Sequence, residues 1–213
     1  MNPGLSSSTK SRILQAANEL FFRQGIKRIT MDDIAGHLGM SKKTIYRSFR
    51  DKNELVTALT VQELETQALE MSEIRKSSEN SVDEIVQVMG CVSRTFGRTH
   101  PSLFYDLQKY HGGAWDNFRI FKEKELTGFI EENLRRGIRF ELYRKNLKIK
   151  ILARLRIEEI EMGFNPAIFP PGKFPITEVQ LEMLDHFLHG IVTLKGFKLI
   201  DKYKRLRLLQ PKN

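Results

Sequence analysis

The chain has one cysteine among 213 residues, and this scarcity excludes two kinds of structure. A single thiol, Cys91, cannot form an intrachain disulfide, and it cannot build a zinc site from cysteine ligands. No stretch approaches the ~18 consecutive apolar residues that a transmembrane helix needs. The polar N-terminal segment also lacks the apolar core of a secretory signal. We therefore expect a cytoplasmic protein without a membrane partner.

The patterns that mark catalysis and β-structure are also missing. The sequence has no nucleophile–base arrangement, no phosphate-binding loop and no paired catalytic acids, so we expect neither an enzyme nor a cofactor. His186 and His189 have a spacing that suits a metal, but no third ligand accompanies them, and we predict no metal site. No segment alternates apolar and polar residues with a period of two, which predicts an all-α protein.

Positive charge is abundant, and it is concentrated at the two ends of the sequence. The formal net charge of +9 indicates an anionic partner such as nucleic acid or a membrane surface. Between Met1 and Thr60, ten basic residues stand against five acidic ones, and from Lys195 onward seven basic residues stand against Asp201 alone. We expect the first region to bind DNA. The second could touch a membrane or DNA, but a solvated helix end is the favoured interpretation.

The stretch Thr30–Phe49 predicts two short helices joined by a tight turn. Thr30 begins the first helix with a short capping box, Gly39 supplies the turn, and Ser41 caps the second helix. Ile45 and Phe49 point inward because they are four residues apart on a helix. The opposite side presents residues suited to phosphates and base edges: Lys42, Lys43, Thr44, Tyr46 and Arg47. This arrangement is typical of a helix-turn-helix that enters a DNA groove.

Further helices are expected on both sides of this stretch. One ends at Gly25, and a long one begins near Lys52 and runs at least to Met71. The segment 165–175 holds four of the seven prolines and is predicted to be a loop. Residues suited to capping a helix predict five helix starts: Ser8 or Thr9, Asp51 with Glu54, Ser81, Asn146, and Thr177 with Glu178. The last of these helices is expected to run to about Lys204.

A longer pattern, covering about fifty residues, comprises Phe22, Gly25, Thr30, Asp32-Asp33-Ile34-Ala35, Gly39-Met40-Ser41-Lys42, Thr44-Ile45-Tyr46, Phe49, Lys52 and Leu55. It strongly resembles the DNA-binding domain of the tetracycline-repressor (TetR) family of bacterial transcription regulators. The rest of the chain matches that family only in size, helical content and a long final helix. The resemblance implies an N-terminal three-helix DNA-binding domain over residues 6–66 and a larger helical ligand-binding and dimerisation domain over residues 67–213.

The resemblance also implies a homodimer on a partly palindromic operator of double-stranded DNA, released or reshaped when a small-molecule effector enters the larger domain. Thr30, Tyr46 and Lys52 are then expected to hold the DNA backbone, while Lys42, Lys43 and Thr44 are candidates for base contact. The full set of predicted DNA-binding residues is Thr30, Ser41, Lys42, Lys43, Thr44, Tyr46, Arg47 and Lys52.

The larger domain is expected to bind an apolar or aromatic effector and to dimerise. Aromatic residues crowd the middle of the chain and suit such a pocket, although a packed helical core also explains them. The last helix is apolar on more than one side, which indicates a partner helix, or else a central helix in a monomer. The predicted ligand-binding residues are Phe96, Phe104, Tyr105, Tyr110, Trp115, Phe118 and Phe121, and the predicted dimer-interface residues are Leu184, Leu188, Gly190, Ile191, Val192 and Gly196.

These features together predict a ligand-responsive, dimeric transcriptional regulator that acts as a repressor. One alternative is a ligand-independent dimeric regulator whose C-terminal domain only dimerises or recruits a protein partner. Another is an enzyme with an appended helix-turn-helix, which the missing catalytic arrangement disfavours.

Overall fold

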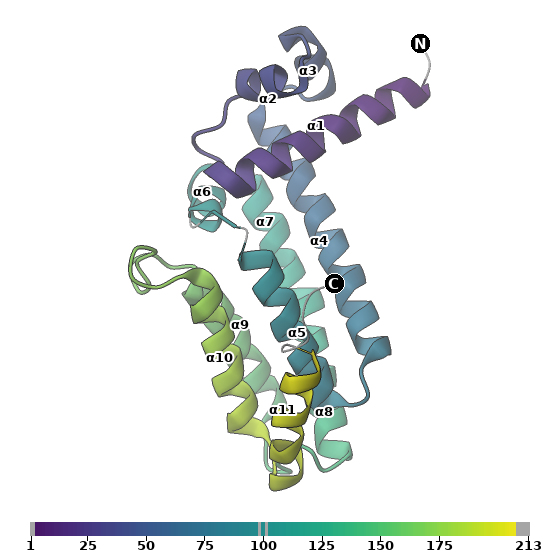
Figure 1. Ribbon diagram of the computed structural model, residues 1–213, viewed down its shortest axis with the longest axis vertical. Coiled ribbons are helices and arrows are strands. Elements are labelled where there is room, and N and C mark those ends of the chain that lie inside the picture. The colour runs from purple at the N-terminus through teal and green to yellow at the C-terminus, as the bar shows by residue number, and fades with distance from the viewer. Residues whose placement is uncertain (1–2, 98, 101, 208–213) are drawn as a thin grey trace. The chain divides into compact units, whose positions relative to one another are not determined.

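The computed structural model describes residues 3–97, 99–100 and 102–207, which form two compact helical units (Figure 1). Of these, residues 3–66, 99–100 and 102–120 belong to the first unit, and residues 67–97 and 121–207 to the second. Within the described ranges, the only β-structure is an isolated antiparallel bridge between Tyr143 and Val192. The predicted all-α class is confirmed. No described helix combines the length and apolar character needed to cross a bilayer.

The first unit surrounds a core to which every one of its helices contributes. Its elements are α1 (Pro3–Gln24), α2 (Met31–Leu38), α3 (Lys42–Ser48), the first part of α4 (Lys52–Ser77), α6 (Leu103–Tyr110) and most of α7 (Gly112–Phe121). The buried core residues include Ile13, Phe21, Ile34, Ile45, Leu55, Leu107 and Ala114. The apolar side chains of these helices therefore pack against one another in a shared core.

Two features of the first unit differ from expectation. α1 begins at Pro3 rather than behind Ser8 or Thr9, because proline, which lacks an N–H, fits the first turn of a helix. Residues 102–120 are expected in the larger domain but pack within the first unit. A division of function between residues 66 and 67 remains a prediction.

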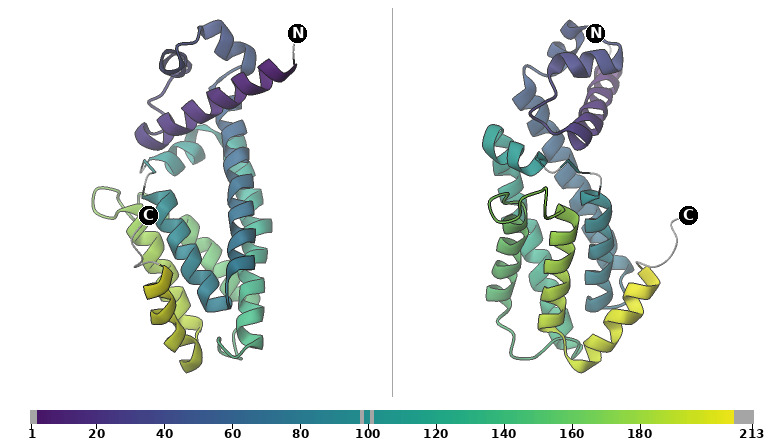
Figure 2. Two further views of the ribbon diagram at one scale, coloured as in Figure 1. Left: turned by 45° about the vertical axis from the view of Figure 1, so that its right-hand side comes forward. Right: turned by 60° about the vertical axis from the view of Figure 1, so that its left-hand side comes forward.

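The second unit contains the end of α4 and the helices that follow, except α6 and most of α7. Its other elements are α5 (Ser81–Phe96), η1 (Lys122–Leu126), α8 (Thr127–Arg139), α9 (Ile149–Gly163), α10 (Ile176–Ile191) and α11 (Leu194–Arg207). α9 and α10 lie side by side, and α10 and α11 both pack on α5 (Figure 2). η1 is one π-helical turn in which the buried Lys122 pairs with Glu161 of α9.

Helix starts in the second unit correct three predicted caps. One of them is Thr177, because α10 begins at Ile176, directly after Pro175, and has no side-chain cap. Asn80, not Ser81, caps α5, because the Asn80 side chain accepts from the backbone N–H groups of Val82 and Asp83 at 3.0 and 3.2 Å. α9 begins at Ile149 without a side-chain cap, so Asn146 lies outside it. The predicted loop at 165–175 is confirmed.

The helix expected to run from Thr177 to Lys204 is divided into α10 and α11 at Val192–Thr193. Val192 is extended and forms the bridge with Tyr143, while the Thr193 N–H donates to the Leu142 carbonyl oxygen at 2.9 Å. The Thr193 hydroxyl then accepts from the Gly196 N–H at 3.2 Å and starts α11. The pairing of Val192 and Thr193 with the segment after α8 thus outweighs the apolar helical pattern that continues through these residues in the sequence.

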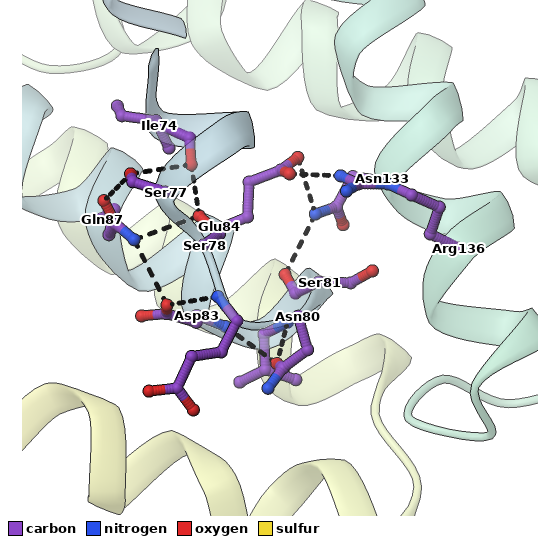
Figure 3. A network of polar contacts seen from close by, with 12 residues as sticks. Ile74, Ser77, Ser78, Asn80, Ser81, Asp83, Glu84, Gln87, Asn133 and Arg136 are labelled. Carbon is purple, nitrogen blue, oxygen red and sulfur yellow. Dashed lines mark hydrogen bonds and ion pairs between the residues drawn. The ribbon is translucent and has the colours of Figure 1, made fainter. Parts of the chain in front are cut away.

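A buried polar network joins α5 to α8 (Figure 3). The carboxylate of Glu84 is fully buried, accepts from Asn133 Nδ2 at 3.0 Å and pairs with Arg136. Asn133 Nδ2 also donates to the Ser81 carbonyl oxygen at 3.0 Å. The Tyr143 hydroxyl contacts that same oxygen and Asn133 Oδ1, both at 2.9 Å, and burial raises the pKa of Tyr143, which keeps the hydroxyl a donor. The network therefore fixes the register of α5 against α8.

Candidate nucleic-acid interface

The α2–turn–α3 segment is fixed by local hydrogen bonds that the sequence predicts. The Thr30 hydroxyl accepts from the Asp33 N–H at 3.1 Å, and the Asp33 carboxylate accepts from the Thr30 N–H at 2.8 Å. The Thr30 hydroxyl also donates to Asp33 Oδ2 at 2.7 Å, and this bond, followed by the one from the Thr30 N–H, lowers the pKa of Asp33. Gly39 has φ of 61°, and the Ser41 hydroxyl accepts from the Thr44 N–H at 3.2 Å. The capping box, the glycine turn and the serine cap are all confirmed.

Packing decides which side of α3 remains exposed. Ile45 is fully buried and Phe49 is 1% exposed, so this side of the helix faces the core. The other side is exposed and basic, and the Tyr46 ring lies there with 50% of its surface exposed. The exposed predicted residues on α3 are Lys42, Lys43, Tyr46 and Arg47, with Thr44 half-buried beside them. The structure therefore brings the predicted α3 residues together on one surface, which we call the recognition face.

The cations of the recognition face are not equivalent. Lys42 Nζ donates to the Asp32 carboxylate at 2.5 Å, and this hydrogen bond raises the pKa of Lys42. Among the described residues, no ion pair holds Lys43 or Arg47. Lys43 and Arg47 can thus turn toward an anion without losing a carboxylate partner.

Two predicted backbone-binding residues have structural roles within the first unit. Lys52 Nζ donates to the Ile26 carbonyl oxygen at 2.6 Å and lies 5.9 Å from the centre of the Phe21 ring. Burial lowers the pKa of Lys52. The Thr30 hydroxyl is already used in the capping box. Both contacts stabilise the turn between α1 and α2, and DNA contact by either residue remains a prediction.

The α1–α2 connection is also held by α6, which sequence reasoning placed elsewhere. Asp106 is 3% exposed, and its Oδ2 accepts from the Lys27 N–H and from the Ser102 hydroxyl, each at 3.0 Å. The His100 N–H donates to the Phe22 carbonyl oxygen at 2.7 Å. In the sequence, Asp106 stands between the apolar residues Leu103 and Leu107 of α6. A carboxylate on an apolar helix face needs hydrogen-bond donors when it is buried, and this pattern was the signal that could have predicted the contact.

The predicted ligand-binding aromatic residues are divided between the two units. Phe104, Trp115 and Phe118 contact one another in the first unit, with ring centroids 6.0 Å apart for Phe104–Phe118 and 5.1 Å apart for Trp115–Phe118. Tyr105 and Tyr110 are in the same unit. The remaining two, Phe96 and Phe121, belong to the second unit.

A groove of about 450 Å³ in the first unit includes one of these aromatic residues, Tyr110. One wall is a face of α4 and the other is the α6–α7 junction. There, His111 Nδ1 donates to Asn53 Oδ1 at 2.6 Å. The residues that line the groove are Arg50, Asn53, Glu54, Thr57, Ala58, Tyr110, His111, Gly112 and Gly113.

Four predicted dimer-interface residues are used inside the protomer, which corrects their assignment. Leu184, Leu188 and Ile191 are 0–3% exposed in the core of the second unit and have no surface left for a partner. A Cβ on Gly196 would overlap the Leu142 carbonyl oxygen, so this glycine allows a close approach within the chain. Of the remaining two, Gly190 is exposed and Val192 is half-buried.

Comparison with known sequences gives matches to transcriptional regulators. The family model described as "Bacterial regulatory proteins, tetR family" matches residues 13–59. The HTH-type transcriptional regulator YvaF of Bacillus subtilis (strain 168) is 25% identical over 181 residues, which cover 84% of this chain and 94% of that protein. An HTH-type transcriptional regulator of Staphylococcus aureus (strain MRSA252) is 31% identical over 179 residues, which cover 73% and 96% respectively.

Solved structures share the fold at low sequence identity. A TetR-family transcriptional regulator from Agrobacterium tumefaciens matches with a TM-score of 0.72 and 16% identity, covering 88% of this chain and 100% of that one. A transcriptional regulator from Saccharomonospora viridis in complex with choline matches with a TM-score of 0.69 and 17% identity, covering 88% and 99%. The helical fold of this chain is thus found in other proteins.

Proposed function

Since the chain belongs to the TetR family of bacterial regulatory proteins, and is therefore a helix-turn-helix transcriptional regulator rather than an enzyme, we propose that it is a dimeric repressor released from a palindromic operator by a small molecule. The observation that carries this proposal is the recognition face, which is exposed and basic on a helix whose opposite side is buried. The proposed place of action is the cytoplasm, where the operator lies.

In this proposal α3 enters the major groove while α2 braces it. Lys43 and Arg47 donate to phosphates or to guanine edges, and the Tyr46 hydroxyl bonds a phosphate oxygen. Lys42 contacts the DNA while its ammonium group keeps the hydrogen bond to the Asp32 carboxylate. Two recognition helices must lie about 34–36 Å apart to read successive major grooves, so one protomer alone reads half an operator.

Alanine substitutions on the recognition face test this reading. Lys43→Ala and Tyr46→Ala should leave the protein folded, because Lys43 is exposed and Tyr46 is 50% exposed. Each loses one contact per protomer, worth about 1–3 kcal/mol, so a dimer should bind its operator roughly 30-fold more weakly or worse. Lys76→Ala, an exposed lysine on the second-unit part of α4, is the matched control. Unchanged affinity of both variants in a gel-shift assay at moderate salt would refute the proposal.

The dimer contact that we propose uses the exposed face of α9. Ile151, Leu155 and Met162 are 67%, 50% and 38% exposed, and their spacing puts them on one side of that helix. A face this apolar favours contact with a second copy of itself across a two-fold axis. Leu155→Glu should therefore give a monomer by light scattering and lose operator affinity, while Leu69→Glu, whose leucine is 70% exposed on α4, should remain a dimer. A dimeric Leu155→Glu variant would contradict this interface.

For the effector we propose a small apolar or aromatic molecule. The choline complex of the Saccharomonospora viridis regulator supports small-molecule binding by this fold, and the aromatic residues around Trp115 support the ligand class. Release follows when the effector binds the DNA-free state more tightly than the DNA-bound state.

The effector proposal can be tested with an intrinsic probe. Trp115 is the only tryptophan, and it contacts Phe118 within the predicted set. Compounds that raise thermal stability should change Trp115 fluorescence and weaken operator binding. If stabilising compounds leave operator affinity unchanged, the alternative of a ligand-independent regulator is favoured.

A further inference from the structure

One end of the second unit forms a surface that the proposed function does not use. It consists of residues 139–150 and residues 192–198, which lie together at the α10–α11 turn (Figure 1). The Thr193 hydroxyl donates to the Glu141 carbonyl oxygen at 2.8 Å, and Lys195 Nζ donates to the Phe140 carbonyl oxygen at 3.1 Å. With the Tyr143–Val192 bridge, these bonds join the two segments. We call this surface the basic tip.

The basic tip is strongly cationic. Five basic residues and one acidic residue, Glu141, fall within 139–150, and two more basic residues and no acidic one fall within 192–198. All seven cations are exposed: Arg139, Arg144, Lys145, Lys148, Lys150, Lys195 and Lys198. The partner that fits such a surface is anionic.

Large apolar side chains protrude among these cations. Leu194, in the first turn of α11, is 83% exposed, and Phe140 and Phe197 are 57% and 49% exposed. Removing apolar side chains from water is favourable, so these exposed side chains favour a partner that can bury them. Basic residues that surround protruding leucine and phenylalanine side chains are typical of proteins that bind at the lipid headgroup boundary.

We propose that the basic tip docks on an anionic lipid bilayer, with Leu194, Phe140 and Phe197 entering the headgroup region and the surrounding cations facing lipid phosphates. Nucleic acid would engage the cations but leave the apolar side chains in water. A second copy of the tip would oppose seven cations with seven. A bilayer satisfies both the charge and the apolar groups, and the contact is peripheral. This proposal departs from the sequence-based expectations of no membrane partner and of a solvated basic helix end.

Vesicle flotation of the full-length protein tests the proposal. We expect the protein to float with vesicles that contain about a third phosphatidylglycerol, and to stay behind with phosphatidylcholine alone, since each cation near an anionic surface contributes about fivefold in affinity. Lys148→Gln with Lys198→Gln should thus weaken binding about 25-fold. Leu194→Gln should weaken it about fivefold or more. Raising the salt concentration should weaken binding by the wild type.

Matched controls separate the tip from other exposed groups. Lys173→Gln, in the 165–175 loop, and Leu69→Gln, on α4, change exposed residues outside the tip and should bind vesicles like the wild type. Lys43→Ala should also retain vesicle binding, and the tip variants should retain operator binding. A failure of DNA recognition is therefore distinguishable from a failure of lipid docking.

Three outcomes would overturn the proposal. Vesicle binding that survives both tip variants would show that the cations and Leu194 take no part. A second outcome is that the wild type binds no vesicles and the tip variants no longer bind duplex DNA that lacks the operator. That result would make the surface a nucleic-acid site. A monomer from Leu194→Gln in light scattering would assign this leucine to contact between protomers.

Discussion

Replacing Arg136 by methionine should destabilise the second unit by roughly 3–5 kcal/mol, the cost of stranding a buried charge. The Glu84 side chain is 0% exposed and the Arg136 side chain is 25% exposed. Without the arginine, the carboxylate keeps the Asn133 amide as a donor at 3.0 Å but loses its countercharge. Glu84→Gln leaves a guanidinium that can reach water, so it should cost only about 1–3 kcal/mol.

Urea denaturation measures this asymmetry. Far-ultraviolet circular dichroism reports both units, whereas fluorescence of the single tryptophan, Trp115, reports the first unit. We expect the dichroism transition of Arg136→Met to shift further than the fluorescence transition. The double variant with Glu84→Gln should be more stable than Arg136→Met alone, because it buries no charge. Equal costs for the two single variants, or a double variant less stable than Arg136→Met, would refute the reasoning.

Two further predictions concern a pair of glycines and one histidine. Gly196→Ala should lower the free energy of unfolding by about 2 kcal/mol or more, measured by thermal or urea unfolding, because the new Cβ would overlap the Leu142 carbonyl oxygen. Gly190→Ala has open space around the new Cβ and should raise the free energy of unfolding by about 0.5–1 kcal/mol. Burial, and then the charge of Lys52, lowers the pKa of His111 from its ordinary value of 6.5, so the unfolded chain takes up a proton at this histidine more readily than the folded one. The stability that neutral His111 contributes should be complete above pH 6.5 and fall below it; His111→Gln should flatten this part of the pH profile, and an identical profile would contradict the assignment.

The recognition face is the part of the molecule most completely predictable from sequence. Its signals are local: the Thr30 cap, the Gly39 turn and the Ser41 cap each act within a few residues. Ile45 and Phe49 then fix the buried side by helical spacing alone. An exposed basic face follows without knowledge of any distant contact.

Features that depend on distant contacts were not predictable in the same way. The division between α10 and α11 arises because Val192 pairs with Tyr143, about fifty residues away in sequence. The inclusion of α6 in the first unit depends on Asp106 accepting from the Lys27 N–H. The buried face of the predicted dimer helix was also misassigned, because apolar periodicity shows that a face is buried without identifying the chain that buries it.

The Lys42–Asp32 ion pair gave no clear sequence signal either. These residues lie ten positions apart on different helices, and their pairing depends on how α2 and α3 cross. Lys43, the adjacent lysine, has the same chemistry but forms no ion pair within the described part of the chain. Sequence reasoning therefore treated both lysines as equivalent, and only the side-chain geometry distinguishes a tethered ammonium from an untethered one.

The loop at 165–175 joins two helices that are also held together by other means. α9 and α10 pack along their lengths, and at the far end the Tyr143–Val192 bridge attaches the segment before α9 to the residue after α10. A protease cut within the loop would therefore leave two fragments that stay associated. The same position suits an inserted peptide tag, or a new pair of chain ends in a circularly permuted protein.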